Sequence, residues 1–194
     1  PKEVPGTTVN RNCSSALEAV NLAAKTILVG EGDLAIGSGV ECMSRAPWAM
    51  MKPERLPTTS PPKMWDTTVG WRFNNAKMDE MYPIVSLGEG AEIIAEEMQI
   101  SRDDQDAYSL ESHSRAIAAI NDGKFKDEII EISVPQRRGD PVVVDTDEHP
   151  RYEKSNGKYE MAIDTESLAK LRPAFKKDGS VTAGNSSGIN DGAA

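Results

Sequence analysis

Cys13 is the residue whose surroundings most clearly suggest chemistry, because it lies where a β-prone segment gives way to a helical one. The residues after it place apolar side chains three and four apart, which predicts an amphipathic helix over residues 14–29. A helix N-terminus collects unsatisfied backbone N–H groups and about half a positive charge, which favours a thiolate over a thiol. The position of Cys13 therefore predicts a cysteine nucleophile.

A buried, inert thiol is the alternative interpretation of Cys13, since free cysteine is commonly a small core residue. Cys42 follows a predicted buried strand and has no comparable flanking sequence, so we expect it to fill the core. The two cysteines are not spaced as in a disulfide framework or a metal knuckle. With only two histidines in the chain, no metal site is predicted.

The composition is that of a soluble globular protein, with 38% hydrophobic and 27% charged residues among 194. The net charge of −9 argues against nucleic acid or an anionic membrane surface as a partner. No apolar run reaches the roughly 18 residues of a membrane span. No signal peptide is apparent, so we expect a cytoplasmic location, or an organelle matrix in a eukaryote. The sequence begins at Pro1 and ends in a loop-like stretch, and we expect both ends to be cut.

The order of predicted elements indicates an α/β fold. Residues 7–11 and 33–40 are predicted strands on either side of the helix over 14–29. This order, with short links, predicts a right-handed βαβ unit and hence a parallel sheet. Cys13 would then lie at the carboxyl end of a strand, where open α/β sheets usually place their sites.

Residues 44–73 contain five prolines and three tryptophans, which interrupt regular structure but supply apolar anchors. We therefore expect a packed excursion anchored by Trp48, Trp65 and Trp71, with disorder as the alternative.

Beyond this excursion the sequence predicts helices over 88–98 and 102–121, the second with Ser101 and Asp104 at its start and Gly123 at its end. The rest is predicted as a strand over 128–134, a surface loop over 136–160, a short helix over 167–171 and a small-residue loop over 180–188.

Several long motifs, in a fixed order, resemble the thiolase family. The nucleophile segment of that family is similar to residues 9–17 (VNRNCSSAL), and its next strand and turn are similar to residues 37–47 (GSGVECMSRAP). The segment returning from its loop domain is similar to residues 171–175 (LRPAF) and 178–194 (DGSVTAGNSSGINDGAA). Residues 100–106 (ISRDDQD) and 123–129 (GKFKDEI) fit as well, so the resemblance covers nearly the whole chain.

The resemblance implies a parallel-sheet core segment over residues 1–44, an inserted, largely helical and irregular loop domain over 45–180 that covers CoA, and a return to the core over 181–194. It implies that Cys13 accepts an acyl group from a 3-ketoacyl-CoA or acetyl-CoA as a thioester, which CoA or an acetyl-CoA carbanion then resolves. The resemblance further implies a hydrogen bond from Ser187 to pantetheine and a tunnel wall formed by Phe175, Ala183 and Gly184.

The resemblance also implies that coenzyme A is a substrate, that no cofactor is permanently bound, and that the full-length enzyme is a homodimer or homotetramer. The family's Gly-His-Pro histidine, second cysteine and Asn-Glu-Ala-Phe asparagine do not occur in these 194 residues. We therefore expect about half a subunit, inactive by itself.

The sequence departs from the family in one further place. Many biosynthetic members carry His-Met-Gly where this chain has Ser86, Leu87 and Gly88. Together with the bulky insertion over residues 64–73, this departure favours an acyl chain larger than acetoacetyl. The alternative function is that of a non-catalytic CoA- or acyl-binding relative, for which Ser187 would matter and Cys13 would not.

Overall fold

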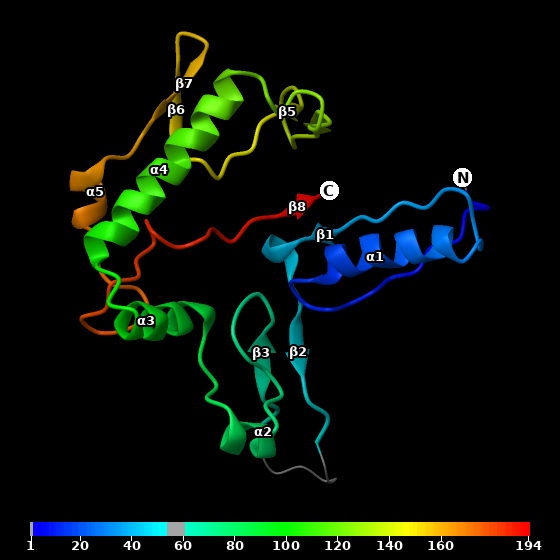
Figure 1. Cartoon of the computed structure of the whole chain (residues 1–194), viewed down its shortest axis with the longest axis horizontal. Coiled ribbons are helices and arrows are strands. Elements are labelled where there is room, and N and C mark those ends of the chain that lie inside the picture. Colours follow the sequence, from blue (N-terminus) through cyan, green and yellow to red (C-terminus); the bar gives the residue numbers. More distant parts are fainter. Residues whose placement is uncertain (1, 54–60) are drawn as a thin grey trace. The chain divides into compact units, whose positions relative to one another are not determined.

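The structure is a computed structural model that describes residues 2–53 and 61–194. The chain forms two compact units, one running up to Val69 and including Ile189–Ala194, the other comprising Gly70–Gly188. Figure 1 labels most of the helices and strands of both units. None of the helices in the described residues is long and apolar enough to cross a membrane. The predicted limits of core segment and loop domain, at residues 44, 45, 180 and 181, stay predictions.

The first unit contains one long helix, α1 (Ser15–Leu28), where the apolar spacing predicts a helix. Its other elements are short: β1 (Val40–Glu41), the 3₁₀ turn η1 (Met43–Arg45), β2 (Trp48–Met50), β3 (Met64–Asp66) and β8 (Gly192–Ala193). β1 pairs with β8 and β2 with β3, both antiparallel. The end of the chain therefore lies beside β1, where Gly39 and Ala194 exchange two backbone hydrogen bonds of 2.8 and 2.9 Å.

The parallel pairing expected of residues 7–11 and 33–40 is not formed within the described residues. Residues 7–11 contain no strand beyond an isolated bridge between Arg11 and Cys13, and only Val40 of the second segment lies in one. The expected contact with the helix is present. A Cβ on Gly37 would lie 2.7 Å from the Val20 backbone. Residues 33–38 thus lie beside α1, but no strand of the described residues pairs with them. Strand geometry depends on hydrogen bonds from such a neighbour.

Two of the three tryptophans do not anchor their segments within the described residues. Trp48 is 70% exposed and Trp71 is 63% exposed, so the prediction is wrong for both, whereas Trp65 is half-buried. A two-stranded hairpin such as β2–β3 has no second layer to cover its side chains. The indole N–H of Trp71 nevertheless donates to the Val85 carbonyl at 2.7 Å. Pro57, one of the five prolines, lies outside the described residues.

The second unit contains four helices in the described residues: α2 (Ala76–Met81), α3 (Leu87–Glu97), α4 (Arg102–Asn121) and α5 (Thr165–Ala169). α3 and α4 begin and end within one residue of the prediction, because local signals set their ends. The Ser101 side chain accepts the backbone N–H of Asp104 at 3.1 Å, and Gly123 takes the left-handed conformation with φ of 69°. α5 lies two residues earlier than predicted.

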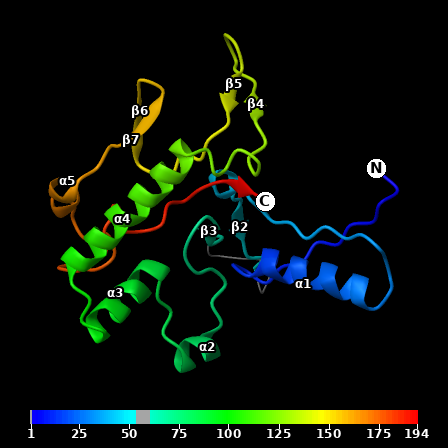
Figure 2. The ribbon, with the colours of Figure 1, turned by 45° about the horizontal axis from the view of Figure 1, so that its top comes forward.

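Residues 128–161 form two hairpins, where a strand and a surface loop are predicted. The strands are β4 (Ile132–Val134), β5 (Val142–Val144), β6 (Tyr152–Ser155) and β7 (Lys158–Met161). The loop prediction for 136–160 is therefore wrong. Asn156 and Gly157, which connect β6 to β7, both have positive φ, as the Asn-Gly pair of a tight hairpin requires. Figure 2 shows the two hairpins as separate ribbons.

Most buried residues of the described chain gather where α3, α4 and α5 meet residues 180–184, whereas Ile117 lies further along α4. Besides Gly184, the buried residues are four hydrophobic ones (Ala95, Ile117, Leu168 and Val181) and three polar or charged ones (Glu92, Asp106 and Thr182). Apolar burial within the described residues is therefore slight.

Two glycines of α3 allow a test of this packing. A Cβ on Gly88 would lie 2.3 Å from the Phe175 ring, whereas a Cβ on Gly90 would meet nothing within 4 Å. We expect Gly88→Ala to lower the free energy of unfolding by about 1–3 kcal/mol, because the ring must move. Gly90→Ala should raise it by about 0.5–1 kcal/mol, because alanine loses less backbone entropy. Denaturant titrations measure both, and equal effects would contradict the placement of Phe175 on α3.

Candidate active site

Cys13 lies in the tight turn that leads into α1. The backbone N–H groups of Ser14 and Ser15 donate to the Arg11 and Asn12 carbonyls, both at 3.1 Å. Asn12 takes the left-handed conformation with φ of 51°. Cys13 is exposed and lies two residues before the first helical residue, close to the helix start that the sequence predicts.

Side chains of the flanking residues hold this turn. The Ser15 hydroxyl accepts the Arg11 N–H at 2.8 Å and donates to the Asn12 carbonyl at 2.7 Å. The Arg11 guanidinium also forms a 2.6 Å ion pair with Glu18 on the first turn of α1. Residues on both sides of Cys13 are thus held by hydrogen bonds, which leaves the thiol on a fixed turn.

The first turn of α1 offers backbone donors close to Cys13, beyond the N–H groups of Ser14 and Ser15 that are already hydrogen-bonded. The N-cap residue Ser14 makes no side-chain capping hydrogen bond, so its hydroxyl does not satisfy the first-turn N–H groups. Such groups attract negative charge through the helix dipole. An exposed thiol in this position is suited to nucleophilic attack on a carbonyl carbon. The N–H groups beside it are suited to stabilise the resulting oxyanion.

Cys42 does not fill a core, contrary to the prediction. It is exposed, and its thiol lies 3.8 Å from an Asp191 carboxylate oxygen. The same carboxylate accepts the backbone N–H of Ser44 at 2.9 Å and its hydroxyl at 2.5 Å. The turn after β1 is therefore tied to the segment before β8 by polar contacts, because the first unit has no buried layer there.

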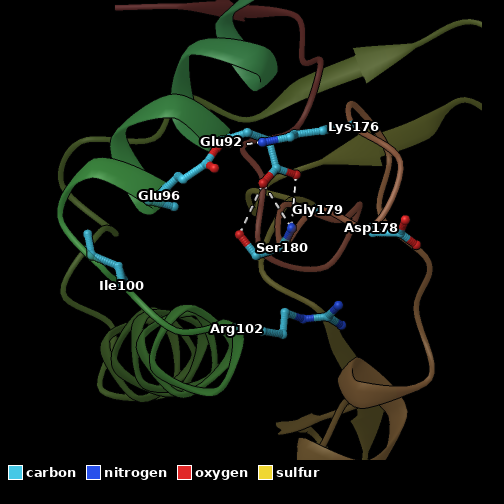
Figure 3. Close-up of a pocket in the computed structure, with 9 residues that line it drawn as sticks. Glu92, Glu96, Ile100, Arg102, Lys176, Asp178, Gly179 and Ser180 are labelled. Carbon is cyan, nitrogen blue, oxygen red and sulfur yellow. Dashed lines mark hydrogen bonds and ion pairs between the residues drawn. The ribbon is translucent and has the colours of Figure 1, made fainter.

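In the second unit, a buried carboxylate on α3 holds the start of the 180–188 loop. Glu92 is 4% exposed. It accepts the backbone N–H of Ser180 at 2.8 Å, that of Val181 at 2.8 Å and the Ser180 hydroxyl at 3.1 Å. Gly179 permits this approach, since a Cβ there would collide with the Glu92 carboxylate. Figure 3 shows the carboxylate directed at Ser180.

A second buried carboxylate, on α4, holds the rest of the same loop. Asp106 is 4% exposed and accepts the Asn185 amide at 2.9 Å. The Asn185 side chain in turn accepts the Thr182 N–H at 2.7 Å and donates to the Ser180 carbonyl at 3.1 Å. Arg102 completes the network with a 2.7 Å ion pair to Asp106 and a 2.5 Å hydrogen bond to the Leu168 carbonyl of α5.

The four residues that the resemblance assigns to CoA binding all belong to the second unit. The Phe175 ring lies on Gly88 of α3, and Gly184 is buried against Leu168. Ala183 is exposed, and its carbonyl accepts a 2.9 Å hydrogen bond from Arg151. Ser187 is exposed at the end of the loop. Cys13 belongs to the other unit, so the structure does not relate these residues to it.

An open cavity of about 420 Å³ lies between α3, the start of α4 and residues 176–180, as Figure 3 shows. Its lining includes Lys176 and Glu96, which form an ion pair of 2.5 Å. Its wall also includes Arg102, whose guanidinium is engaged by Asp106 and by the Leu168 carbonyl of α5. The lining residues contain neither a cysteine nor a histidine, and the cavity was not predicted.

The buried carboxylates are the functional supports that sequence reasoning missed. Glu92 stands three residues before Ala95, on the same face of α3, and the apolar period does not reveal that an acid occupies that face. Asp106 likewise lies among the charged residues near the start of α4, and nothing in its sequence position marks it as buried. Asn185 was the one sequence signal of these buried partners, because its amide offers two donors and an acceptor within a loop of small residues.

Burial raises the pKa of the Glu92 carboxyl, but hydrogen bonds from Ser180 and Val181 outweigh burial, so the pKa lies below its ordinary 4.5. A depressed pKa stabilises the fold above the unfolded-state pKa, and this stabilisation is lost as the pH falls through the folded-state value.

We expect Glu92→Gln to lower the free energy of unfolding at neutral pH by about 1–3 kcal/mol, because an amide N–H₂ group would face backbone donors. The deficit relative to wild type should shrink as the pH falls below about 4.5. Glu96→Gln is the control, since its ion pair with Lys176 is exposed and surface ion pairs contribute little to stability. Denaturant titrations from pH 7 to pH 3 measure both variants. A deficit for Glu92→Gln that does not change with pH would contradict this interpretation.

Comparison with known proteins assigns the whole chain to one family. The family model described as thiolase, N-terminal domain, matches residues 1–194. The chain is 49% identical over 194 residues to a beta-ketoadipyl-CoA thiolase of Acinetobacter baylyi and 41% identical over 194 residues to a 3-oxoadipyl-CoA/3-oxo-5,6-dehydrosuberyl-CoA thiolase of Escherichia coli. Each match covers 100% of this chain and 46% of the relative, so the chain spans about half the length of these curated relatives.

Solved structures agree with this assignment. The acetyl-CoA acetyltransferase of Bacillus anthracis matches with a TM-score of 0.78 at 37% identity, over 100% of this chain and 45% of that one. Human mitochondrial 3-ketoacyl-CoA thiolase matches with a TM-score of 0.77 at 33% identity and the same coverage. The predicted fold class is thereby confirmed as the thiolase fold, although the described residues do not form its parallel pairing by themselves. The chain belongs to the thiolase family and represents an N-terminal segment of it.

Proposed function

We propose that the full-length protein is a thiolase that transfers acyl groups between CoA thioesters through a thioester on Cys13. The observation that carries the proposal is the exposed thiol on a hydrogen-bonded turn at the start of α1, in a chain that matches the thiolase N-terminal domain from end to end. A helix start supplies the partial positive charge that a thiolate nucleophile needs.

The names of the relatives favour a particular acyl group. Those described above act on beta-ketoadipyl-CoA or 3-oxoadipyl-CoA, whose acyl chain ends in a carboxylate. This agrees with the presence of Leu87 where many biosynthetic members have methionine, a departure that favours a larger acyl chain. We therefore assign a 3-oxo dicarboxylic acyl-CoA as the substrate, rather than acetoacetyl-CoA.

The proposed reaction has two steps. The Cys13 thiolate attacks the C3 carbonyl carbon of 3-oxoadipyl-CoA, the C2–C3 bond breaks, and the departing acetyl-CoA carbanion takes up a proton. Coenzyme A then attacks the succinyl thioester and releases succinyl-CoA and the free thiol. The resemblance assigns the base and the proton donor to a histidine and a second cysteine outside residues 1–194, so these residues alone are not expected to turn over.

The second unit would hold the CoA of both steps. In the proposed arrangement the Ser187 hydroxyl binds pantetheine while Phe175, Ala183 and Gly184 line its path. The support is the position of Ser187 at the exposed end of a loop that Glu92 and Asp106 fix to two helices. The proposal includes a homodimer or homotetramer in the cytoplasm or an organelle matrix, with CoA as substrate and no resident cofactor.

Replacement of the thiol tests the nucleophile. We expect Cys13→Ala in the full-length enzyme to abolish the acyl-enzyme and to lower turnover by about 10⁴-fold or more, as for other nucleophile deletions. Cys42→Ala is the matched control, since this thiol is also exposed, and it should retain the adduct. Mass spectrometry after incubation with acetyl-CoA measures both. An adduct mapped to Cys42, or full turnover by Cys13→Ala, would refute the assignment of Cys13. A wild-type enzyme that forms no adduct and does not turn over would favour a non-catalytic binding protein.

Neighbouring serines separate binding from folding. The Ser186 hydroxyl donates to the Thr182 carbonyl at 2.5 Å, whereas Ser187 makes no hydrogen bond within the part of the chain that the structure describes. We expect Ser187→Ala to raise the KM for CoA about 3- to 10-fold and to leave the melting temperature unchanged. Ser186→Ala should lower the stability by about 1 kcal/mol. Steady-state kinetics measure the KM for CoA, and thermal unfolding measures the stability. An unchanged KM for Ser187→Ala would contradict a role of Ser187 in CoA binding.

A further inference from the structure

A second cavity, of about 210 Å³, lies beside α2 in the second unit. Pockets that enclose a whole ligand are usually about 300–1,000 Å³, so this one is of a size to take one end of a ligand. It is lined by Trp71, Arg72, Phe73, Asn74, Asn75, Met78, Asp79, Tyr82, Pro83 and Ile84.

Local hydrogen bonds set the shape of this cavity. The Trp71 indole N–H donates to the Val85 carbonyl, so the two ends of the lining segment are held together. Asn75 caps α2, with its side chain accepting the Lys77 N–H at 3.0 Å and its carbonyl accepting the Met78 N–H at 2.9 Å. The apolar wall formed by Trp71, Met78 and Tyr82 is therefore attached to a fixed backbone.

Arg72 brings the one positive charge among the lining residues. Its guanidinium donates to the Gly70 carbonyl at 3.0 Å. Among the ion pairs of residues 2–53 and 61–194, none involves Arg72. Asp79, on the first turn of α2, contributes a negative charge to the same lining but lies beyond ion-pair distance.

We propose that this pocket binds the terminal carboxylate of a dicarboxylic acyl group, with Arg72 as its counter-ion. The assignment rests on the proposed function, which supplies an acyl chain that ends in a carboxylate. The methylene groups of such a chain match the Trp71 and Met78 walls, and a guanidinium can bind a carboxylate through two parallel hydrogen bonds. Asp79 weakens the binding by repulsion, so its charge limits the affinity.

Two CoA thioesters of equal chain length test the proposal directly. Adipyl-CoA and hexanoyl-CoA have six acyl carbons each and differ only in the terminal carboxylate. We expect the full-length wild-type enzyme to bind adipyl-CoA about tenfold more tightly or better, the usual contribution of a hydrogen bond to a charged group. Isothermal titration calorimetry gives both dissociation constants without requiring turnover.

Three variants locate the preference. Arg72→Met keeps an unbranched side chain but removes the charge. It should abolish the preference for adipyl-CoA. Arg72→Lys should retain part of it, because the charge remains without the planar fork. Asp79→Asn should increase it, since the repulsion disappears. Because Asp79→Asn is expected to increase the preference for adipyl-CoA, it tests the carboxylate site even if Arg72→Met does not fold.

The outcomes separate this assignment from the proposed function. A wild-type enzyme without the preference, an Arg72→Met variant that keeps it, or equal weakening of both thioesters, as expected from a contact to the CoA phosphates, would overturn the carboxylate site. An Asp79→Asn variant without an increase would also overturn it. Thiolysis of 3-oxoadipyl-CoA by the wild type tests the proposed function by itself. Its absence, together with an adipyl preference that Arg72→Met abolishes, would refute the thiolase proposal and support the pocket assignment.

Discussion

Two buried carboxylates are the constraint on which the second unit depends. Glu92 of α3 and Asp106 of α4 both accept hydrogen bonds from the segment between Ser180 and Asn185. Burying a charge is costly unless hydrogen bonds compensate it. Glu92 is compensated by donors of this segment, and Asp106 by the Asn185 amide together with the Arg102 guanidinium. The two carboxylates therefore fix the loop to both helices, although few apolar side chains are buried among them.

The two candidate sites are built on different physical principles. The Cys13 turn is held by contacts within a few residues, such as those of Ser15 to Arg11 and Asn12. The loop that ends in Ser187 is held by contacts across about eighty residues or more, from Glu92 and Asp106. Local contacts form early and re-form after disturbance, whereas the long-range network incurs a loop-closure cost and fails as a unit.

This distinction also explains how much of the fold and site could be predicted. The ends of α4 follow from Ser101 and Gly123, and the position of Cys13 follows from a change of apolar period, all of which are local. The hairpin at Asn156 was missed although its Asn-Gly signal is equally local. Strand pairing over residues 7–11 and the burial of Glu92 depend on distant partners, which periodicity does not reveal.

The left-handed backbone of Asn12 has a consequence for how this segment can vary in evolution. A positive φ is accommodated by glycine, asparagine and aspartate at little cost, whereas a β-branched residue there is strained. Backbone geometry alone would therefore keep asparagine or glycine at this position in descendants of this sequence, whether or not the side chain meets a substrate. Retention of the residue that precedes the thiol would then reflect the turn and would not by itself identify a catalytic group.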